Sequence, residues 1–130
     1  MENKIKVVVV RPNEEARVEE IEQNLDSYQQ IVDGWIECIY PFEEAVCLVC
    51  NDEGKFNGCL PNRALVDEDG NITDMIFGTF FIADCSGEQF ESLSEEQLKK
   101  YTELFREPEQ LCRMGGKYFV TRGDVFVGAI

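Results

Sequence analysis

The segment that decides the fold is Lys4-Ile5-Lys6-Val7-Val8-Val9-Val10, which is followed by Arg11-Pro12. Its continuous β-branched residues predict a strand. Four consecutive valines also predict that both faces of this strand are buried, as in a central strand of a sheet. Further along the chain, apolar runs predict strands at residues 35–40, 45–50 and 75–83, the last with a bulge at Gly78. Residues 59–66 are expected to be irregular.

Two segments have the apolar periodicity of helices. Asn13 is a suitable N-cap, and the apolar residues that follow it recur at three- and four-residue spacing up to Gly34, which predicts a first helix. In the second segment, Ser94 and Gln97 have the spacing of a capping box, and Pro108 closes the helix. The apolar residues that define the first helix are Val18, Ile21, Leu25, Tyr28 and Ile31.

These elements predict an α+β fold. We expect a mixed or mainly antiparallel sheet of four to five strands with two helices packed on one face, and the first helix connecting two strands in a right-handed crossover. The length of 130 residues suits one domain, which we place at residues 1–105. Residues 106–130 are expected to be a C-terminal extension, either a hairpin or an arm.

Charge excludes several functions. The chain has 26 acidic and 12 basic residues, a formal net charge of -14, and no histidine. Nucleic acids and anionic membranes attract basic proteins, so we expect neither as a direct partner. Without histidine, the usual general base near neutral pH is missing, so an enzyme is the less favoured class. With no apolar segment long enough for a signal peptide or a membrane span, we expect a cytoplasmic protein.

The six cysteines are interpreted as reduced core thiols, because a disulfide framework belongs to secreted chains. Cys47 and Cys50 form a C-x-x-C motif flanked by Cys38 and Cys59, so a four-thiolate zinc site is the alternative. Residues three apart in a strand point to opposite faces, which argues against a shared metal. We therefore expect no metal and no cofactor.

The acidic face of the predicted first helix is the leading candidate for an interaction surface. An ordered group of carboxylates can stand in for phosphates, which would make the protein an electrostatic decoy for a basic or nucleic-acid-binding protein. The simpler explanation is that the acid keeps the protein soluble. The residues of this candidate surface are Glu15, Glu19, Glu22 and Asp26.

The polar segment from Asn51 to Arg63 is the alternative site, for a small ligand or a minor enzymatic activity. Glu53 would act as a base, Arg63 as an anion clamp and Asn62 as an orienting donor. The structural alternative is that Asn62 caps a turn and Arg63 pairs with a nearby carboxylate. The candidate binding residues are Asn51, Glu53, Lys55, Asn62 and Arg63.

The order of these segments resembles a known family. The valine-rich strand is followed by Gly34-Trp35-Ile36-Glu37, Asn51-Asp52-Glu53-Gly54-Lys55, Leu60-Pro61-Asn62-Arg63-Ala64 and Asp74-Met75-Ile76-Phe77-Gly78-Thr79. This pattern is similar to the small domain-of-unknown-function family numbered 3846, found in phages, mobile elements and their bacterial hosts. The resemblance covers roughly residues 4 to 105. It implies a cytosolic protein and no particular catalytic residues.

Overall fold

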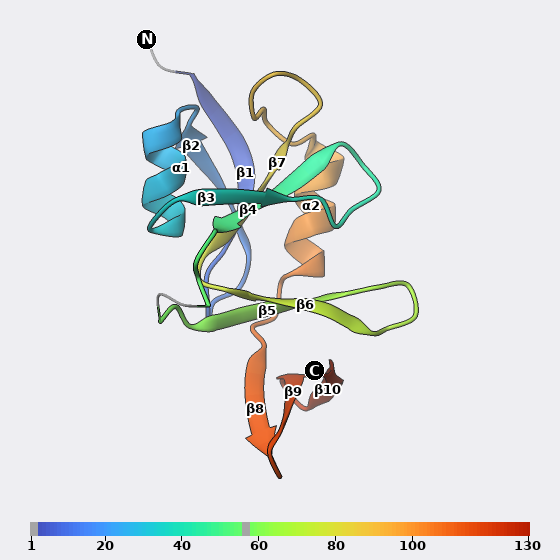
Figure 1. Ribbon diagram of the computed structural model, residues 1–130. Helices are drawn as coiled ribbons and strands as arrows, with labels where there is room; N and C mark the ends of the chain where they lie inside the picture. Colours follow the sequence, from blue (N-terminus) through green and yellow to red (C-terminus); the bar gives the residue numbers. More distant parts are fainter. Residues whose placement is uncertain (1–2, 56–57) are drawn as a thin grey trace.

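The valine run lies in an interior strand of a five-stranded sheet, next to one edge strand (Figure 1). The structure is a computed structural model that describes residues 3–55 and 58–130. Its helices are α1 (Leu25–Val32) and α2 (Glu95–Leu104). The strands are β1 (Lys4–Val10), β2 (Arg17–Glu22), β3 (Ile36–Ile39), β4 (Val46–Asn51), β5 (Pro61–Val66), β6 (Ile72–Phe77), β7 (Phe80–Asp84), β8 (Gln110–Met114), β9 (Lys117–Arg122) and β10 (Val125–Ala129).

The predicted α+β class and antiparallel sheet are confirmed. The main sheet has the strand order β2-β1-β7-β4-β3, and all of its pairs are antiparallel. The prediction of a single sheet is wrong, because β5 and β6 form a separate two-stranded sheet and β8 to β10 a three-stranded one. The predicted right-handed crossover is also wrong, since it needs parallel strands.

The helices pack on opposite faces of the main sheet, not on one face as predicted. Alternation along β1 sends Val8 and Val10 into a cluster with α2, and Val7 and Val9 into a cluster with α1. All four valines are fully buried, as the uninterrupted run predicted. Figure 1 shows α1 and α2 on either side of β1 and β7. Because the side chains of β1 are apolar on both faces of the sheet, each face must be buried, and one helix packs on each.

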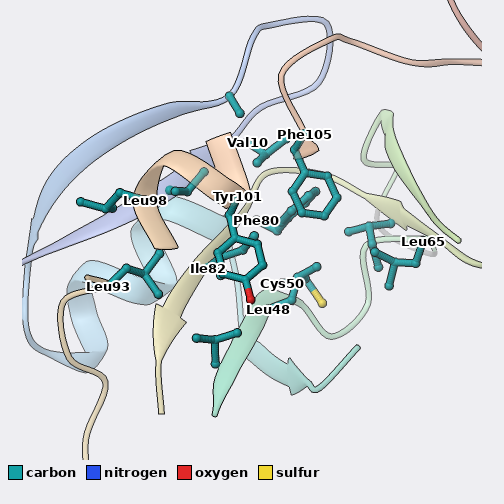
Figure 2. Packing of buried hydrophobic residues seen from close by; sticks show 14 residues of the cluster. Val10, Leu48, Cys50, Leu65, Phe80, Ile82, Leu93, Leu98, Tyr101 and Phe105 are labelled. Carbon is teal, nitrogen blue, oxygen red and sulfur yellow. The ribbon is translucent and has the colours of Figure 1, made fainter. Parts of the chain in front are cut away.

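The core on the α2 side is built around aromatic rings (Figure 2). The rings of Phe80 and Phe105 meet edge to face with their centroids 5.3 Å apart, and Tyr101 is fully buried beside them. The Tyr101 hydroxyl donates a hydrogen bond to Glu44, which also accepts one from Lys100 at 3.0 Å. These hydrogen bonds lower the pKa of Glu44 to about 2, and the bond from Tyr101 has the largest effect. They fasten the β3–β4 connection to α2.

The predicted helix at residues 13–34 begins much later than expected. Residues 17–22 form β2, which pairs with β1 so that Glu22 lies opposite Lys4 and Glu20 opposite Lys6. These cross-strand charge pairs and the backbone ladder outweigh the local helical spacing. Asn24, not Asn13, is the N-cap, and its side chain accepts from the backbone of Ser27 at 2.8 Å. The acidic helix of the interaction hypothesis therefore does not exist as one element.

Gly78 divides the strand that was predicted at residues 75–83. It has φ of 84°, a conformation that favours glycine, and the chain leaves β6 there to start β7 in another sheet. The region predicted to be irregular after Pro61 is instead β5, which pairs with β6. Residues 52–55 and Gly58 form turns on the two sides of Phe56 and Asn57, which lie outside the described residues.

The last three strands pack on the β5–β6 sheet. Val120 of β9 is fully buried against Ala64 and Met75, and Figure 1 shows β5 and β6 between the main sheet and β8. The predicted capping box of α2 is confirmed, with Ser94 and Gln97 exchanging their bonds. Neither helix of the described part of the chain is long and apolar enough to cross a membrane.

Candidate functional site

Asn51 is a structural residue at the end of β4. Its side-chain amide donates to the carbonyls of Val32 at 3.1 Å and Asp33 at 3.0 Å, and its Oδ1 accepts from the backbone of Glu53 at 2.8 Å. The carbonyls at the end of a helix lack intrahelical partners. Asn51 therefore closes α1 and orders the turn that follows β4.

Asn62 is buried and bridges two segments. Its Nδ2 donates to the carbonyls of Val10 and Gly78, both at 2.9 Å. Its Oδ1 accepts from Nη1 of Arg63 at 2.8 Å. All three bonds remain inside the protein, so Asn62 fixes β5 against the end of β1.

Arg63 is fully buried, and its guanidinium donates only to uncharged oxygens. Nε and Nη2 reach the Phe105 carbonyl at 3.1 and 2.9 Å, and Nη2 also reaches the Glu14 carbonyl at 2.6 Å. Burial lowers the pKa of Arg63, and the Glu109 carboxylate partly opposes this shift. With its donors already used, Arg63 is placed to hold the chain together and not to bind an incoming anion.

The remaining loop residues are on the surface. Glu53 is exposed, and Lys55 pairs with Asp74 at 2.8 Å. Asn51 and Lys55 line a hollow of about 140 Å³ to which Glu37, Asp52 and Asp74 also contribute. Glu53, Asn62 and Arg63 are not among its lining residues. Of the five loop residues, only Asn51 and Lys55 line this hollow, and a small-ligand role for this loop stays a prediction.

The four acidic residues of the predicted interaction surface are spread over three elements. Glu15 lies in the β1–β2 connection, Glu19 and Glu22 on β2, and Asp26 in the first turn of α1. Arg11 pairs with Glu19 through both guanidinium nitrogens, and Arg106 reaches Glu15 at 3.4 Å. Glu22 lies opposite Lys4. Three of the four carboxylates therefore have a cation of the same chain beside them.

Strand β3 is an open edge of the main sheet. Trp35 and Tyr40, at its two ends, are 71% and 67% exposed. The carbonyl of Trp35 accepts from the backbone of Asp52 at 3.0 Å. Backbone groups alternate in direction along an antiparallel pair, so those of Ile36 and Cys38 point away from β4.

Carboxylates surround this edge. Glu37 and Asp52 are exposed on the face of Trp35, and Asp33 precedes the strand. Among the described residues, none of these three carboxylates forms an ion pair. We call the group Asp33, Trp35, Glu37, Tyr40 and Asp52 the β3 edge surface.

Sequence reasoning placed a strand at residues 35–40 but did not identify its edge as a site. The signal available was the position of the bulky side chains. Trp35 and Tyr40 stand at the strand ends, and Pro41 follows directly. Proline is confined to the borders and edges of sheets, so a short strand that stops at proline is typical of an edge.

The cysteines occupy both faces of β4. Cys47 lies in the core on the α1 side and Cys50 in the core on the α2 side, as predicted for a C-x-x-C motif within a strand. All six cysteines are free. A hydrogen bond from Cys47 lowers the pKa of Cys38 from 9.0 to about 7, and the same bond raises the pKa of Cys47. Burial raises the pKa of Cys50 to about 12.

We therefore expect half-buried Cys38 to be alkylated by iodoacetamide with a midpoint near pH 7, because the thiolate is the reactive form. Cys50 should resist alkylation in the folded protein. The Cys47→Ala variant removes the hydrogen bond and should move the Cys38 midpoint toward pH 9. Pulsed alkylation followed by peptide mass spectrometry measures both midpoints. An unchanged midpoint in the variant would show that Cys47 does not set the reactivity of Cys38.

Comparison with known proteins gives one family. The model of the family described as Domain of unknown function (DUF3846) matches residues 5–106. No curated protein and no solved structure matches the chain.

Proposed function

The chain belongs to the DUF3846 family, and from that premise we propose that it is a non-enzymatic interaction module that binds a basic partner protein. The family description names no activity, so the proposal rests on the surface of this chain. The supporting observation is the β3 edge surface, which combines exposed aromatic side chains with carboxylates that form no ion pair among the described residues.

The acid on β2 gives a useful contrast. Glu19 is held by Arg11 and Glu22 faces Lys4, so reversing these charges would mainly disturb the protein itself. Glu37 and Asp52 have no such role. Their repulsion is relieved when a cation approaches, and complementary charge guides association and partner choice.

Exposed aromatic residues supply the apolar contact that holds a partner once charge has guided it to the surface. Tryptophan and tyrosine are enriched among the residues that dominate the energy of protein interfaces. Trp35 and Tyr40 flank the four-residue strand β3, and each offers a large apolar side chain with a polar group to a partner.

We further propose that this interaction takes place in the cytoplasm, which the six free cysteines support. A basic partner of an acidic protein is often one that binds nucleic acid, so a decoy role against such a protein follows from the same charge. If the acid served solubility alone, we would expect carboxylates without exposed aromatic residues beside them. The β3 edge surface contains both carboxylates and exposed aromatic residues.

The test is a pull-down from bacterial lysate with the immobilised protein, at low and at high salt. A basic protein should be retained at low salt and released as salt rises, because exposed charges are screened over about 10 Å at 0.1 M. The Glu37→Lys/Asp52→Lys variant should lose that protein.

The matched control is Glu68→Lys/Asp69→Lys, which changes the net charge equally. Both side chains are exposed in the turn between β5 and β6, and neither belongs to the β3 edge surface. This control should retain the partner. Equal recovery with all three proteins would show that the β3 edge surface is not a binding site and that the acid serves solubility.

A further inference from the structure

We propose that the basic partner binds by adding an extended segment to the open edge of β3, as a sixth strand of the main sheet. This inference rests on the proposed function and names its binding mode. The outward backbone groups of Ile36 and Cys38 supply donors and acceptors for such a strand.

The other sheet borders are protected against strand addition. The β5–β6 pair and the β9–β10 pair have irregular registers, which indicate bulges. Edge strand β2 carries Arg17 and three glutamates, and β8 carries Arg113. Bulges and edge cations are the devices by which proteins discourage strand addition.

Strand β3 has no bulge and no cation, although it is short. Its register with β4 is continuous, and its only charged residue is Glu37. It contains no proline and no lysine. Its unpaired backbone groups can pair with another strand, and Glu37 discourages a strand that brings no cation.

The two faces of the edge specify what that strand must contain. Glu37 lies on the face of Trp35, and Asp52, directly after β4, lies opposite Trp35. Ile36 and Cys38 lie on the other face, where Tyr40 also belongs by alternation. The complementary segment therefore has lysine or arginine on one face and apolar residues on the other, at alternate positions.

A second copy of the chain fits this edge poorly. Each chain carries a net charge of -14, and pairing two β3 edges brings both groups of carboxylates together. Like charges in close contact oppose association. Charge thus favours a basic segment of another protein as the occupant.

The probe is a synthetic nonapeptide of alternating lysine and valine, titrated into the full chain at low salt. Trp35 is the single tryptophan, so its fluorescence reports directly on this edge. The wild-type protein and Glu68→Lys/Asp69→Lys should give a saturable change in emission, and Glu37→Lys/Asp52→Lys should bind several-fold more weakly.

Two N-methylated peptides separate strand addition from charge attraction. In a strand, the N–H groups of alternate residues point to opposite sides. Two N-methyl groups on valines in one peptide, and two on lysines in the other, therefore block opposite sides at equal charge. We expect about tenfold or greater loss of affinity for one peptide only, since two hydrogen bonds are lost.

Equal affinities for the two methylated peptides would overturn strand addition. If the pull-down partner still requires Glu37 and Asp52 in that case, the proposed function stands and only the binding mode fails. If the lysate yields no salt-sensitive partner and the unmodified peptide does not bind, the proposed function fails as well. Dimers of the free chain in analytical ultracentrifugation would show that a second copy occupies the edge instead.

Discussion

Replacing Arg63 with alanine should lower the free energy of unfolding by about 3–5 kcal/mol, the cost of breaking a buried and fully bonded charged group. The substitution leaves the carbonyls of Glu14, Asn62 and Phe105 without their donors. Each unsatisfied buried acceptor costs about 1–3 kcal/mol. It also leaves a cavity and removes one of two nearby cations from buried Glu109, which keeps its ion pair with Arg122 at 2.9 Å. Thermal and urea unfolding measure the change.

Two control variants define the cause. Arg63→Lys keeps the charge but not the planar fork that reaches separate carbonyls, so we expect a partial loss. Arg106→Ala removes a cation whose side chain is 58% exposed and whose ion pairs lie on the surface. That variant should stay within about 0.5 kcal/mol of the wild type. A similarly small effect of Arg63→Ala would mean that water replaces the guanidinium bonds.

Truncation after Glu107 should leave a cooperatively folded protein of reduced stability. The two cores of the main sheet contain no residue beyond Phe105. The truncation removes buried Val120 and its contacts with Ala64 and Met75, as well as the Glu109 bond to the backbone of Ala64 at 2.8 Å. Losing the burial of about two apolar side chains costs roughly 3–6 kcal/mol.

Differential scanning calorimetry and amide exchange test this expectation. The truncated chain should melt in a single transition at lower temperature, with faster exchange in β5 and β6 than in β1 and β7. Phe126→Ser is a control within the last strands, because Phe126 is largely exposed and outside the cluster around Val120. Loss of the cooperative transition on truncation would show that β8 to β10 complete the main folding unit.

The elements that were predicted well are those whose signal is local. Four consecutive valines leave few alternatives to a buried strand, and Ser94 and Gln97 complete a capping box within one turn. The segment 17–22 was misread because Val18 and Ile21 fit helical spacing. The information that decides it is its pairing with β1, which no local pattern contains.

The site illustrates the same limit. Asn62 and Arg63 have the composition of a polar loop, yet they are buried because their acceptors come from Val10, Glu14 and Phe105. Those residues are distant in sequence, so burial could not be read from the loop itself. The importance of Trp35 likewise depends on β3 being the last strand, a property of sheet order.

The position of β1 has a consequence for synthesis. Its last three valines pair with β7 through Val8–Ile82, Val9–Phe81 and Val10–Phe80, so the ribosome completes the valine run long before its partner strand. An exposed β-branched run without charge is a hazard for aggregation during that interval. The β1–β2 hairpin can form early because its strands are adjacent in sequence, and β2, which carries three glutamates, then covers one edge of β1. The glutamates of β2 thus oppose aggregation of the valine run in the nascent chain until β7 has been synthesised.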